Sequence, residues 1–387
     1  MYDFVYQNTT KILFGRGISS QIGPECAEYG HKALIVYGGQ SAIKSGLISR
    51  IKQSLSDCHI EYFELGGVKA NPLLSKVQEG IELCRREKIR FLLAVGGGSV
   101  IDTAKAVSAG TDYSGDVWDL FTGTGRFHSV LPVGAVVTIP GTGSESSNGA
   151  VITNESSGYK MDIIDDRIRP RFAVLDPELT FTLPAFQTFC AITDILSHVM
   201  ERYFTGVPYA DVSDELCEGL MRAVIKNARI LLSDPTNYNA RAEVMWAAVL
   251  AHNNLLSSGR GGDWASHAIG TELSALYDCT HGATLSVITP AWMHYVMDAD
   301  LPIFTQYAMR VWQVQYDRND PRATALEGIR RLKAFFEEIG VPTTLNALGV
   351  PSDHLEQIAE RAVRNGPIGG IKSLQASDVL KILGGAK

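Results

Sequence analysis

One carboxylate and three imidazoles of this chain have the residue types and spacing of a metal site: Asp194, His198, His267 and His281. Asp194 and His198 stand four residues apart in a segment without Gly or Pro, and on a helix both side chains would lie on one face, one turn apart. His267 and His281 are separated by a polar stretch that has room for a turn. Such ligands suit a borderline cation such as Zn²⁺ or Fe²⁺. A metal that polarises an alcohol or carbonyl oxygen is a catalytic device, so the pattern indicates an enzyme.

These residues also have an ordinary structural interpretation. The chain contains 9 histidines, and an Asp four residues before a His is common as a surface pair on amphipathic helices. Nothing in the local sequence forces His267 and His281 to approach the first pair. The metal hypothesis therefore depends on the elements that have to bring the four side chains together.

The first half of the chain alternates short apolar runs with helical patterns. The apolar runs, each followed by a turn rich in Gly or Pro, cover residues 33–36, 91–95, 135–139 and 172–175. Apolar strands that alternate with helices predict a parallel sheet covered by helices on both faces. From about Pro184 the apolar residues recur at three- and four-residue spacing, as in 210–232 and 239–256, which predicts helices.

This change of pattern predicts two domains. The boundary falls near 180–184, where Thr-Phe-Thr-Leu-Pro interrupts both patterns. We expect an α/β domain at residues 1–182 and an all-helical domain, which contains the four candidate metal ligands, at residues 183–387.

Three consecutive glycines follow one of the predicted strands. Gly96, Gly97 and Gly98 stand between the strand at 91–95 and a helical pattern at 100–106. Backbone N–H groups can approach an anion closely there, and a helix N-terminus adds partial positive charge. A tight turn alone needs fewer glycines, so we favour phosphate binding, with Ser99 as the N-cap of the helix. The spacing differs from the Gly-x-Gly-x-x-Gly fingerprint of the standard Rossmann fold.

A second glycine turn, at residues 138–145, carries several hydroxyl groups. Its Thr and Ser side chains suit contacts with a ribose or a phosphate, and they equally suit local bonds to the backbone. Lys160 follows in a polar stretch, where a solvated surface lysine is the ordinary interpretation. Neither feature is decisive alone.

Composition excludes several classes of function. The 387 residues have 45% hydrophobic and 20% charged side chains, which is typical of a globular protein, and the formal net charge is −7. An acidic chain does not suit nucleic acid or an anionic membrane as the main partner. We expect neither a membrane-spanning segment nor a signal peptide. The 6 cysteines contain no Cys-x-x-Cys pair, which favours reduced thiols in the cytoplasm.

Four motifs, in this order, resemble those of the iron-containing (group III) alcohol dehydrogenases along essentially the whole chain. The motifs are Gly96-Gly97-Gly98-Ser99-x-x-Asp102-x-x-Lys105, Thr138-x-Pro140-x-Thr142-Gly143-Ser144-Glu145, Asp194-x3-His198 and His267-x13-His281. The resemblance is greatest to the branch of NADPH-dependent butanol dehydrogenases and broad-range aldehyde reductases. It implies an N-terminal dinucleotide-binding α/β domain, a C-terminal helical domain, and a metal in the cleft between them.

The resemblance also implies roles for single residues. The metal ligands, which act in catalysis through the metal, would be Asp194, His198, His267 and His281. The cofactor-binding residues would be Gly38, Gly39, Gly96, Gly97, Gly98, Ser99, Asp102, Thr138, Thr142, Ser144, Lys160, Leu179 and Thr182. Many family members carry a further His four residues after the third ligand, where it is thought to help proton transfer. This chain has Thr271 there, which leaves the proton route open.

The turn after the strand at 33–36 indicates which cofactor is used. A turn selective for NAD usually ends in a carboxylate that binds the ribose 2′-hydroxyl, and no Asp or Glu occurs between Gly38 and Arg50. Gly39 leaves space, while Ser41 and Lys44 offer a hydroxyl and a charge to a 2′-phosphate. An ordinary tight turn would use NAD and NADP alike. Together with the resemblance, the turn favours NADP(H).

We therefore expect a metal-dependent alcohol dehydrogenase or aldehyde reductase that transfers a hydride between NADP(H) and small aldehydes or primary alcohols. The resemblance suggests a homodimer. The enzyme alternatives are a polyol dehydrogenase and a sugar-phosphate lyase of the dehydroquinate synthase kind, but only Arg202 and Arg260 could bind an anion near the metal motifs. A metal-binding scaffold without turnover would have lost a ligand or a loop glycine, and none is missing. His252, His294 and Cys279 match no ligand position, and we interpret them as structural.

Overall fold

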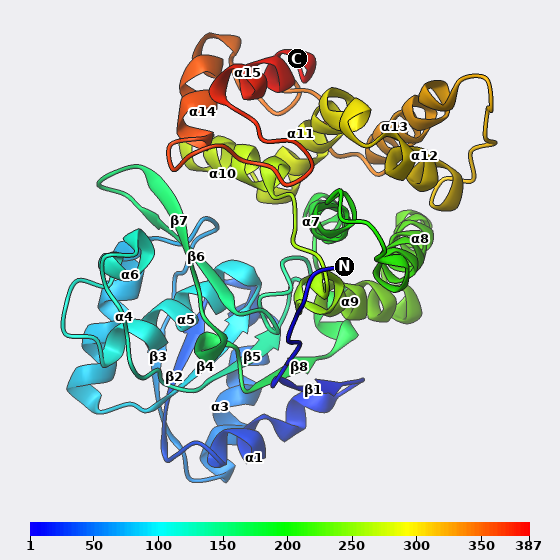
Figure 1. The fold of residues 1–387 in the computed structure, drawn as a ribbon. Coiled ribbons are helices and arrows are strands. Elements are labelled where there is room, and N and C mark those ends of the chain that lie inside the picture. Colours follow the sequence, from blue (N-terminus) through cyan, green and yellow to red (C-terminus); the bar gives the residue numbers. More distant parts are fainter. The chain divides into compact units, whose positions relative to one another are not determined.

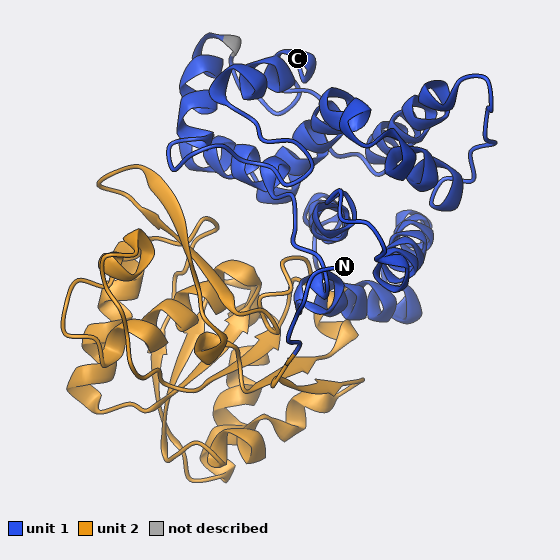
Figure 2. Ribbon diagram, viewed as in Figure 1, with its two compact units in different colours: residues 1–6, 183–387 blue, residues 7–182 orange. Residues whose placement is uncertain are grey.

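The computed structural model describes residues 1–387 with the exception of the side chain of Ser352. It divides into two compact units, which are described separately (Figure 2). Unit 2 consists of residues 7–182, and unit 1 consists of residues 1–6 together with 183–387.

Unit 2 is built around a six-stranded sheet with the strand order β1-β8-β5-β4-β2-β3 (Figure 1). Every strand pairing in it is parallel, and Leu93 of β4, for example, pairs with Ile35 of β2 and with Gly134 of β5. The strands are β1 (Lys11–Phe14), β2 (Lys32–Tyr37), β3 (Glu61–Leu65), β4 (Phe91–Gly96), β5 (Val133–Val137) and β8 (Phe172–Leu175). All four predicted strands are present.

The sheet is covered on both faces. Ile35 and Leu93 share a core with the helices of one face, while Leu34 and Leu92, which point the other way, are also fully buried. This explains why the strands read as continuous apolar runs instead of alternating ones. The helices of unit 2 are α1 (Ile22–Ala27), α2 (Ser41–Lys44), α3 (Leu47–Asp57), α4 (Leu74–Glu87), α5 (Gly98–Thr111) and α6 (Trp118–Thr122).

An antiparallel hairpin, absent from the sequence predictions, also belongs to unit 2. Strands β6 (Gly149–Asn154) and β7 (Tyr159–Ile164) pair with each other, and Thr153 of β6 also forms an isolated bridge with Leu73. The Asn154 side chain accepts hydrogen bonds from the turn N–H groups of Ser156 and Ser157, and Gly158 takes a left-handed conformation with φ 67°. The signal was the turn sequence Asn-Glu-Ser-Ser-Gly between two short apolar runs.

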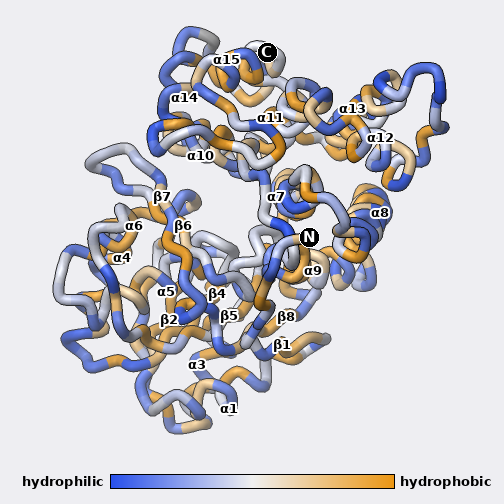
Figure 3. Tube along the Cα trace, viewed as in Figure 1, coloured by the Kyte–Doolittle hydropathy of each residue, from blue (hydrophilic) through white to orange (hydrophobic). Residues whose placement is uncertain are grey.

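The residues of unit 1 from 183 onward form helices packed around one hydrophobic core. Helix α8 shows the amphipathic pattern: Cys217, Met221 and Val224 are buried while polar residues face outward, and Figure 3 shows this alternation along the helix. Its helices are α7 (Ala185–Tyr203), α8 (Asp211–Ser233), α9 (Tyr238–His252), α10 (Ala265–Tyr277), α11 (His281–Val296), α12 (Leu301–Arg310), α13 (Pro321–Glu338), α14 (Leu355–Ala362) and α15 (Ala376–Gly385). The predicted fold class, a parallel α/β sheet followed by a helical region, is confirmed.

Candidate metal centre and cofactor turns

Helix α7 carries the first predicted ligand pair. The segment Ala185–Tyr203 has neither Gly nor Pro, and Pro184 stands immediately before its first turn. Asp194 and His198 lie one helical turn apart, and their side chains are only 5% exposed. A carboxylate and an imidazole buried together in an apolar helix bundle require partners, because burying unpaired polar groups is costly.

The other two ligands come from a helix–turn–helix. His267 lies in the first turn of α10, Asp278 ends that helix in a left-handed conformation, and His281 is the first residue of α11. Gly282 explains why α11 begins so close to α7. A Cβ atom at Gly282 would lie 1.9 Å from the backbone oxygen of Cys190, so only glycine permits this approach.

The three predicted histidine ligands converge on one oxygen atom of the fourth ligand, Oδ1 of Asp194. It lies 3.5 Å from Nδ1 of His198, 3.6 Å from Nε2 of His267 and 3.9 Å from Nε2 of His281. Ligand atoms of Asp194, His267 and His281 all lie within 4.8 Å of one another. His198 is outside this tightest group, but its ring stacks on that of His267 with centroids 4.7 Å apart. The fold therefore juxtaposes residues that are up to 87 positions apart in sequence (281 − 194 = 87).

The donor set fits a divalent cation. Asp194 Oδ1, His198 Nδ1 and His267 Nε2 are buried and have no hydrogen-bond partner among the described residues. Native structures rarely leave buried polar atoms without partners, and three such atoms facing one point indicate a ligand that the protein alone does not supply. Nitrogen and carboxylate oxygen donors are those preferred by Zn²⁺ and Fe²⁺.

Glu201 is a residue of this centre that the sequence predictions missed. Its buried carboxylate accepts hydrogen bonds from Nδ1 of His267 at 2.8 Å, from the backbone N–H of His267 at 3.0 Å and from that of Trp264 at 2.5 Å. When the neutral His267 ring donates a hydrogen bond from Nδ1–H to Glu201, its Nε2 carries the lone pair that faces Asp194. The available signal was spacing, since Asp194, His198 and Glu201 lie on one face of α7.

The pKa values of the His198 and His267 imidazoles are shifted in opposite directions. Burial lowers the pKa of His198 well below its usual value, which favours the neutral, metal-binding form. Burial also acts to lower the pKa of His267, but the carboxylates of Asp194 and Glu201 outweigh it and raise this pKa to about 9. A bound cation has to replace that proton, because an imidazole must be neutral at the nitrogen that binds a metal.

An aromatic ring and a fourth histidine lie beside the centre. The Trp264 ring lies 5.3 Å from that of His267, and the guanidinium of Arg202 lies 4.7 Å above the Trp264 ring. The His252 ring is 4.1 Å from that of His198, so this histidine, which matches no ligand position, nevertheless packs directly against a candidate ligand.

Replacing Glu201 with Gln is expected to weaken divalent-metal affinity about 10- to 100-fold, because both carboxylate oxygens of Glu201 accept hydrogen bonds from residues 264 and 267, and the NH₂ group of an amide cannot accept one. A chelator-competition titration of the purified variant measures this. Glu218→Gln is the matched control, since Glu218 is another fully buried carboxylate of the same unit and accepts from Tyr203 and Gln306 instead. Equal metal affinity in Glu201→Gln and wild type would show that Glu201 does not orient the ligand.

The predicted cofactor turns meet at one edge of the sheet. Because β2, β4 and β5 are adjacent and parallel, the turns that follow them, at 38–39, 96–98 and 138–144, lie side by side at the carboxyl ends of the strands. The N–H of Thr138 donates to the carbonyl oxygen of Gly96 at 3.0 Å. Nucleotides bind at this edge in open α/β sheets.

The glycine turn is closed by direct contact with the second turn. A Cβ atom at Gly98 would lie 2.5 Å from Oγ1 of Thr142, so a side chain at this position would displace that threonine. Helix α5 begins at Gly98, with Gly97 as its N-cap and no side-chain cap bond. The prediction that Ser99 caps the helix is therefore wrong: Ser99 lies inside the first turn, because the helix starts within the glycine run.

The remaining predicted cofactor residues take several positions around this edge. Asp102 accepts from the hydroxyl of Ser144 at 2.5 Å, and Lys160, on β7, donates to Asn71 Oδ1 at 3.0 Å. Ser41 and Lys44 are exposed at the two ends of α2. Leu179 packs against the core of unit 2, and Thr182 is exposed at the last position of that unit.

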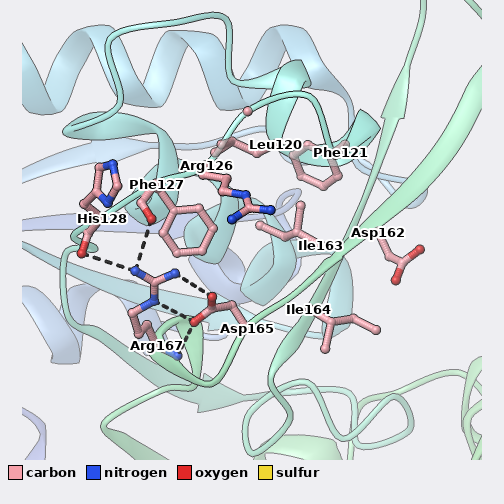
Figure 4. A pocket seen from close by; sticks show the side chains of 12 residues that line it. Leu120, Phe121, Arg126, Phe127, His128, Asp162, Ile163, Ile164, Asp165 and Arg167 are labelled. Carbon is pink, nitrogen blue, oxygen red and sulfur yellow. Dashed lines mark hydrogen bonds and ion pairs between the residues drawn. The ribbon is translucent and has the colours of Figure 1, made fainter.

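A pocket of about 570 Å³ lies elsewhere in unit 2, between α6 and β7 (Figure 4). Phe121, Phe127 and Ile163 form part of its lining. Its Arg167 is already engaged, since it pairs with Asp165 at 2.7 Å and donates to backbone carbonyls. The pocket contains none of the predicted metal or cofactor residues, so we do not assign the activity to it.

Comparison with known proteins shows the class to which this fold and site belong. Residues 9–177 match the family described as iron-containing alcohol dehydrogenase, and residues 188–386 match the C-terminal region of the same family. The chain belongs to the iron-containing alcohol dehydrogenase family.

Individual relatives match over nearly their whole length. The chain is 41% identical to NADH-dependent butanol dehydrogenase A of Clostridium acetobutylicum, over 99% of each chain. It is 36% identical to the NADPH-dependent aldehyde reductase YqhD of Escherichia coli, over 95% of this chain and 94% of the relative. The crystal structure of NADH-dependent butanol dehydrogenase A from Thermotoga maritima is similar with a TM-score of 0.96 and 38% identity, over 100% of this chain and 99% of the other. This chain is thus an oxidoreductase of the alcohol dehydrogenase and aldehyde reductase kind.

Proposed function

We propose that this enzyme binds one divalent metal, Fe²⁺ or Zn²⁺, and transfers a hydride reversibly between NADP(H) and small neutral aldehydes or primary alcohols. The observation that carries the proposal is the convergence of three imidazoles on the buried carboxylate of Asp194, with no partner among the described residues for its Oδ1. The proposed division of labour is that residues 1–182 bind the dinucleotide and residues 183–387 hold the metal.

Each part of the centre has a role in this reaction. His198, His267 and His281 would hold the metal together with Asp194, and Glu201 keeps His267 in the tautomer that offers Nε2. When bound, the metal acts as a Lewis acid on the oxygen of the substrate, and the nicotinamide supplies or accepts the hydride. We propose that the Trp264 ring, which lies 5.3 Å from that of His267, forms an apolar wall of the site.

The proton route differs from the pattern expected for the family. Thr271 lies on α10 one turn after His267 and therefore on the same face. A hydroxyl can relay a proton along a chain of water molecules, but it is not a base near neutral pH. We propose that Thr271 relays the proton between the substrate oxygen and solvent.

The arginines near the metal motifs support a neutral substrate. Arg202 donates to the backbone oxygen of His198 and to the hydroxyl of Ser257. Arg260 donates to the backbone oxygens of Arg202 and Ala210 and to the carboxylate of Asp214 at 2.6 Å. Both are buried and committed to these structural bonds. Neither is available as a clamp for a phosphate or carboxylate of a substrate, which a sugar-phosphate lyase would need.

The choice of NADP(H) rests on the turn after β2. Gly39 is exposed and has no atom within 4 Å of a Cβ position, and the exposed Ser41 and Lys44 follow within α2. This leaves room for a 2′-phosphate and provides a hydroxyl and a positive charge near it. The relatives named above differ in cofactor, NADH for the butanol dehydrogenases and NADPH for YqhD, so the turn itself is the basis of this part of the proposal.

The cellular location and the oligomeric state of the protein are also part of the proposed function. No helix among the described residues is both long and apolar enough to cross a membrane. All 6 cysteines are free thiols, and four of them are buried. We propose a cytoplasmic homodimer, which size-exclusion chromatography coupled to light scattering would test.

The decisive experiment is an NADPH-oxidation assay over a panel of aldehydes, repeated after chelation and after restoring Fe²⁺ or Zn²⁺ separately. We expect short straight-chain aldehydes to be reduced with at least about tenfold higher kcat/KM than analogues bearing phosphate or carboxylate, because Arg202 and Arg260, the arginines near the metal motifs, are engaged in structural bonds. Chelation should abolish the activity, and a metal should restore it. A phosphorylated sugar turned over far more efficiently than every neutral aldehyde, or activity that survives complete metal removal, would overturn the proposal.

A further inference from the structure

Lys105 is a fully buried cation to which the reaction described above gives no role. It lies on α5, two turns after the glycine turn, with 0% of its surface exposed. An isolated ammonium in such a place is costly, so its partners have to compensate for the lost water.

Its partners all lie on one segment, residues 144–149. The Lys105 ammonium donates to the hydroxyl of Ser144 at 3.0 Å, to the backbone oxygen and hydroxyl of Ser147 at 3.0 and 3.2 Å, and to the backbone oxygen of Gly149 at 2.9 Å. One side chain therefore binds the segment at three successive points between the second cofactor turn and β6. Hydrogen bonds from a charged donor are the strong ones.

Neighbouring groups extend the same attachment. Asp102, one turn before Lys105, accepts from the hydroxyl of Ser144 and from the backbone N–H of Val151 at 3.1 Å. Ser144 in turn donates its backbone N–H to Oγ1 of Thr142 at 3.2 Å, and Thr142 is the residue that packs on Gly98. A continuous path of contacts thus runs from the ammonium to the contact between the two cofactor turns.

We propose that Lys105 is a positioning residue for the cofactor: its ammonium holds the segment 144–149 against α5 and thereby sets the position of Thr142 and Ser144 relative to the glycine turn at 96–98. The inference rests on the proposed cofactor role of these turns. It predicts that loss of the ammonium weakens cofactor binding more than it slows the chemical step, because the metal ligands lie on other helices.

The test compares NADPH binding, measured by fluorescence of the bound nicotinamide, in the metal-loaded wild type and three variants. Lys105→Met should raise the Kd for NADPH about tenfold or more while kcat at saturating cofactor changes less than about threefold. Ser147→Ala removes one acceptor of the Lys105 ammonium and keeps its bonds to the backbone, so it should raise the Kd for NADPH by about threefold. This variant replaces Lys105→Met in the test if Lys105→Met does not fold. Ser108→Ala is the matched control, since Ser108 is buried on the same helix but donates to Leu131 instead.

The variants separate positioning from general stability. Ser108→Ala is expected to lower the melting temperature and leave the Kd for NADPH unchanged. If Lys105→Met and Ser147→Ala bind NADPH as wild type does, or if Ser108→Ala weakens binding as much as they do, the positioning role is overturned and Lys105 is only structural. Failure of the wild type to bind NADPH or NADH would instead overturn the proposed function on which the inference rests.

Discussion

His267→Ala is expected to remove tight metal binding and nearly all turnover while the protein remains folded. The substitution deletes one of the candidate ligand atoms, Nε2 of His267, which lies 3.6 Å from Asp194 Oδ1. It also leaves Glu201 without its side-chain donor, although the backbone N–H groups of residues 264 and 267 still bond to it. An unpaired buried acceptor costs about 1–3 kcal/mol, which most folded domains tolerate.

Elemental analysis after dialysis, an activity assay and a melting curve check this expectation together. His294→Ala is the control, because His294 is an exposed histidine on α11 outside the metal centre. His281→Ala gives a second test at a lower folding cost, since the His281 side chain is 26% exposed. Full metal content with substantial activity in either variant would contradict the assignment of that histidine as a metal ligand.

Gly39→Asp is expected to reduce kcat/KM with NADPH about 100-fold, equivalent to ~3 kcal/mol, and to leave kcat/KM with NADH within about twofold. A carboxylate at this turn would face the 2′-phosphate with like charge, whereas it can accept a bond from a 2′-hydroxyl. The structure makes the test clean. A Cβ atom at Gly39 meets nothing within 4 Å, and Gly39 does not adopt a left-handed conformation, so the variant should fold normally.

Gly39→Ala separates the effect of charge from that of bulk. It adds the Cβ atom without the carboxylate, and we expect it to keep the cofactor preference of the wild type. Steady-state kinetics with both cofactors at several ionic strengths would check this, because repulsion between exposed charges weakens as salt increases. Equal losses for NADPH and NADH in Gly39→Asp, or a wild type that prefers NADH, would show that this turn does not select the cofactor.

Much of the fold could be predicted from the sequence because local patterns determine it. The strands β2, β4, β5 and β8 follow from apolar runs that end in turns, and helix α7 follows from the absence of Gly and Pro between residues 185 and 203. The pairing of Asp194 with His198 is likewise local, since one helical turn joins them. The glycine turns could be placed after their strands for the same reason.

Other features were decided only by tertiary structure. The hairpin of β6 and β7 has too few residues for a clear pattern, and the start of α5 inside the glycine run depends on how Gly98 packs against Thr142. The role of Glu201 depends on a residue 66 positions away, His267 (267 − 201 = 66), which no local pattern connects to it.

The metal centre shows most clearly which features follow from local sequence and which depend on tertiary packing. Residue types and spacing identified the candidate ligands, but neither the helix pair nor the turn between α10 and α11 determines where His281 lies relative to Asp194. That distance is set by the close packing of α11 on α7, which the missing side chain of Gly282 permits. Long-range packing is determined by shape and burial over the whole helix bundle, and a pattern read along the chain contains no such information.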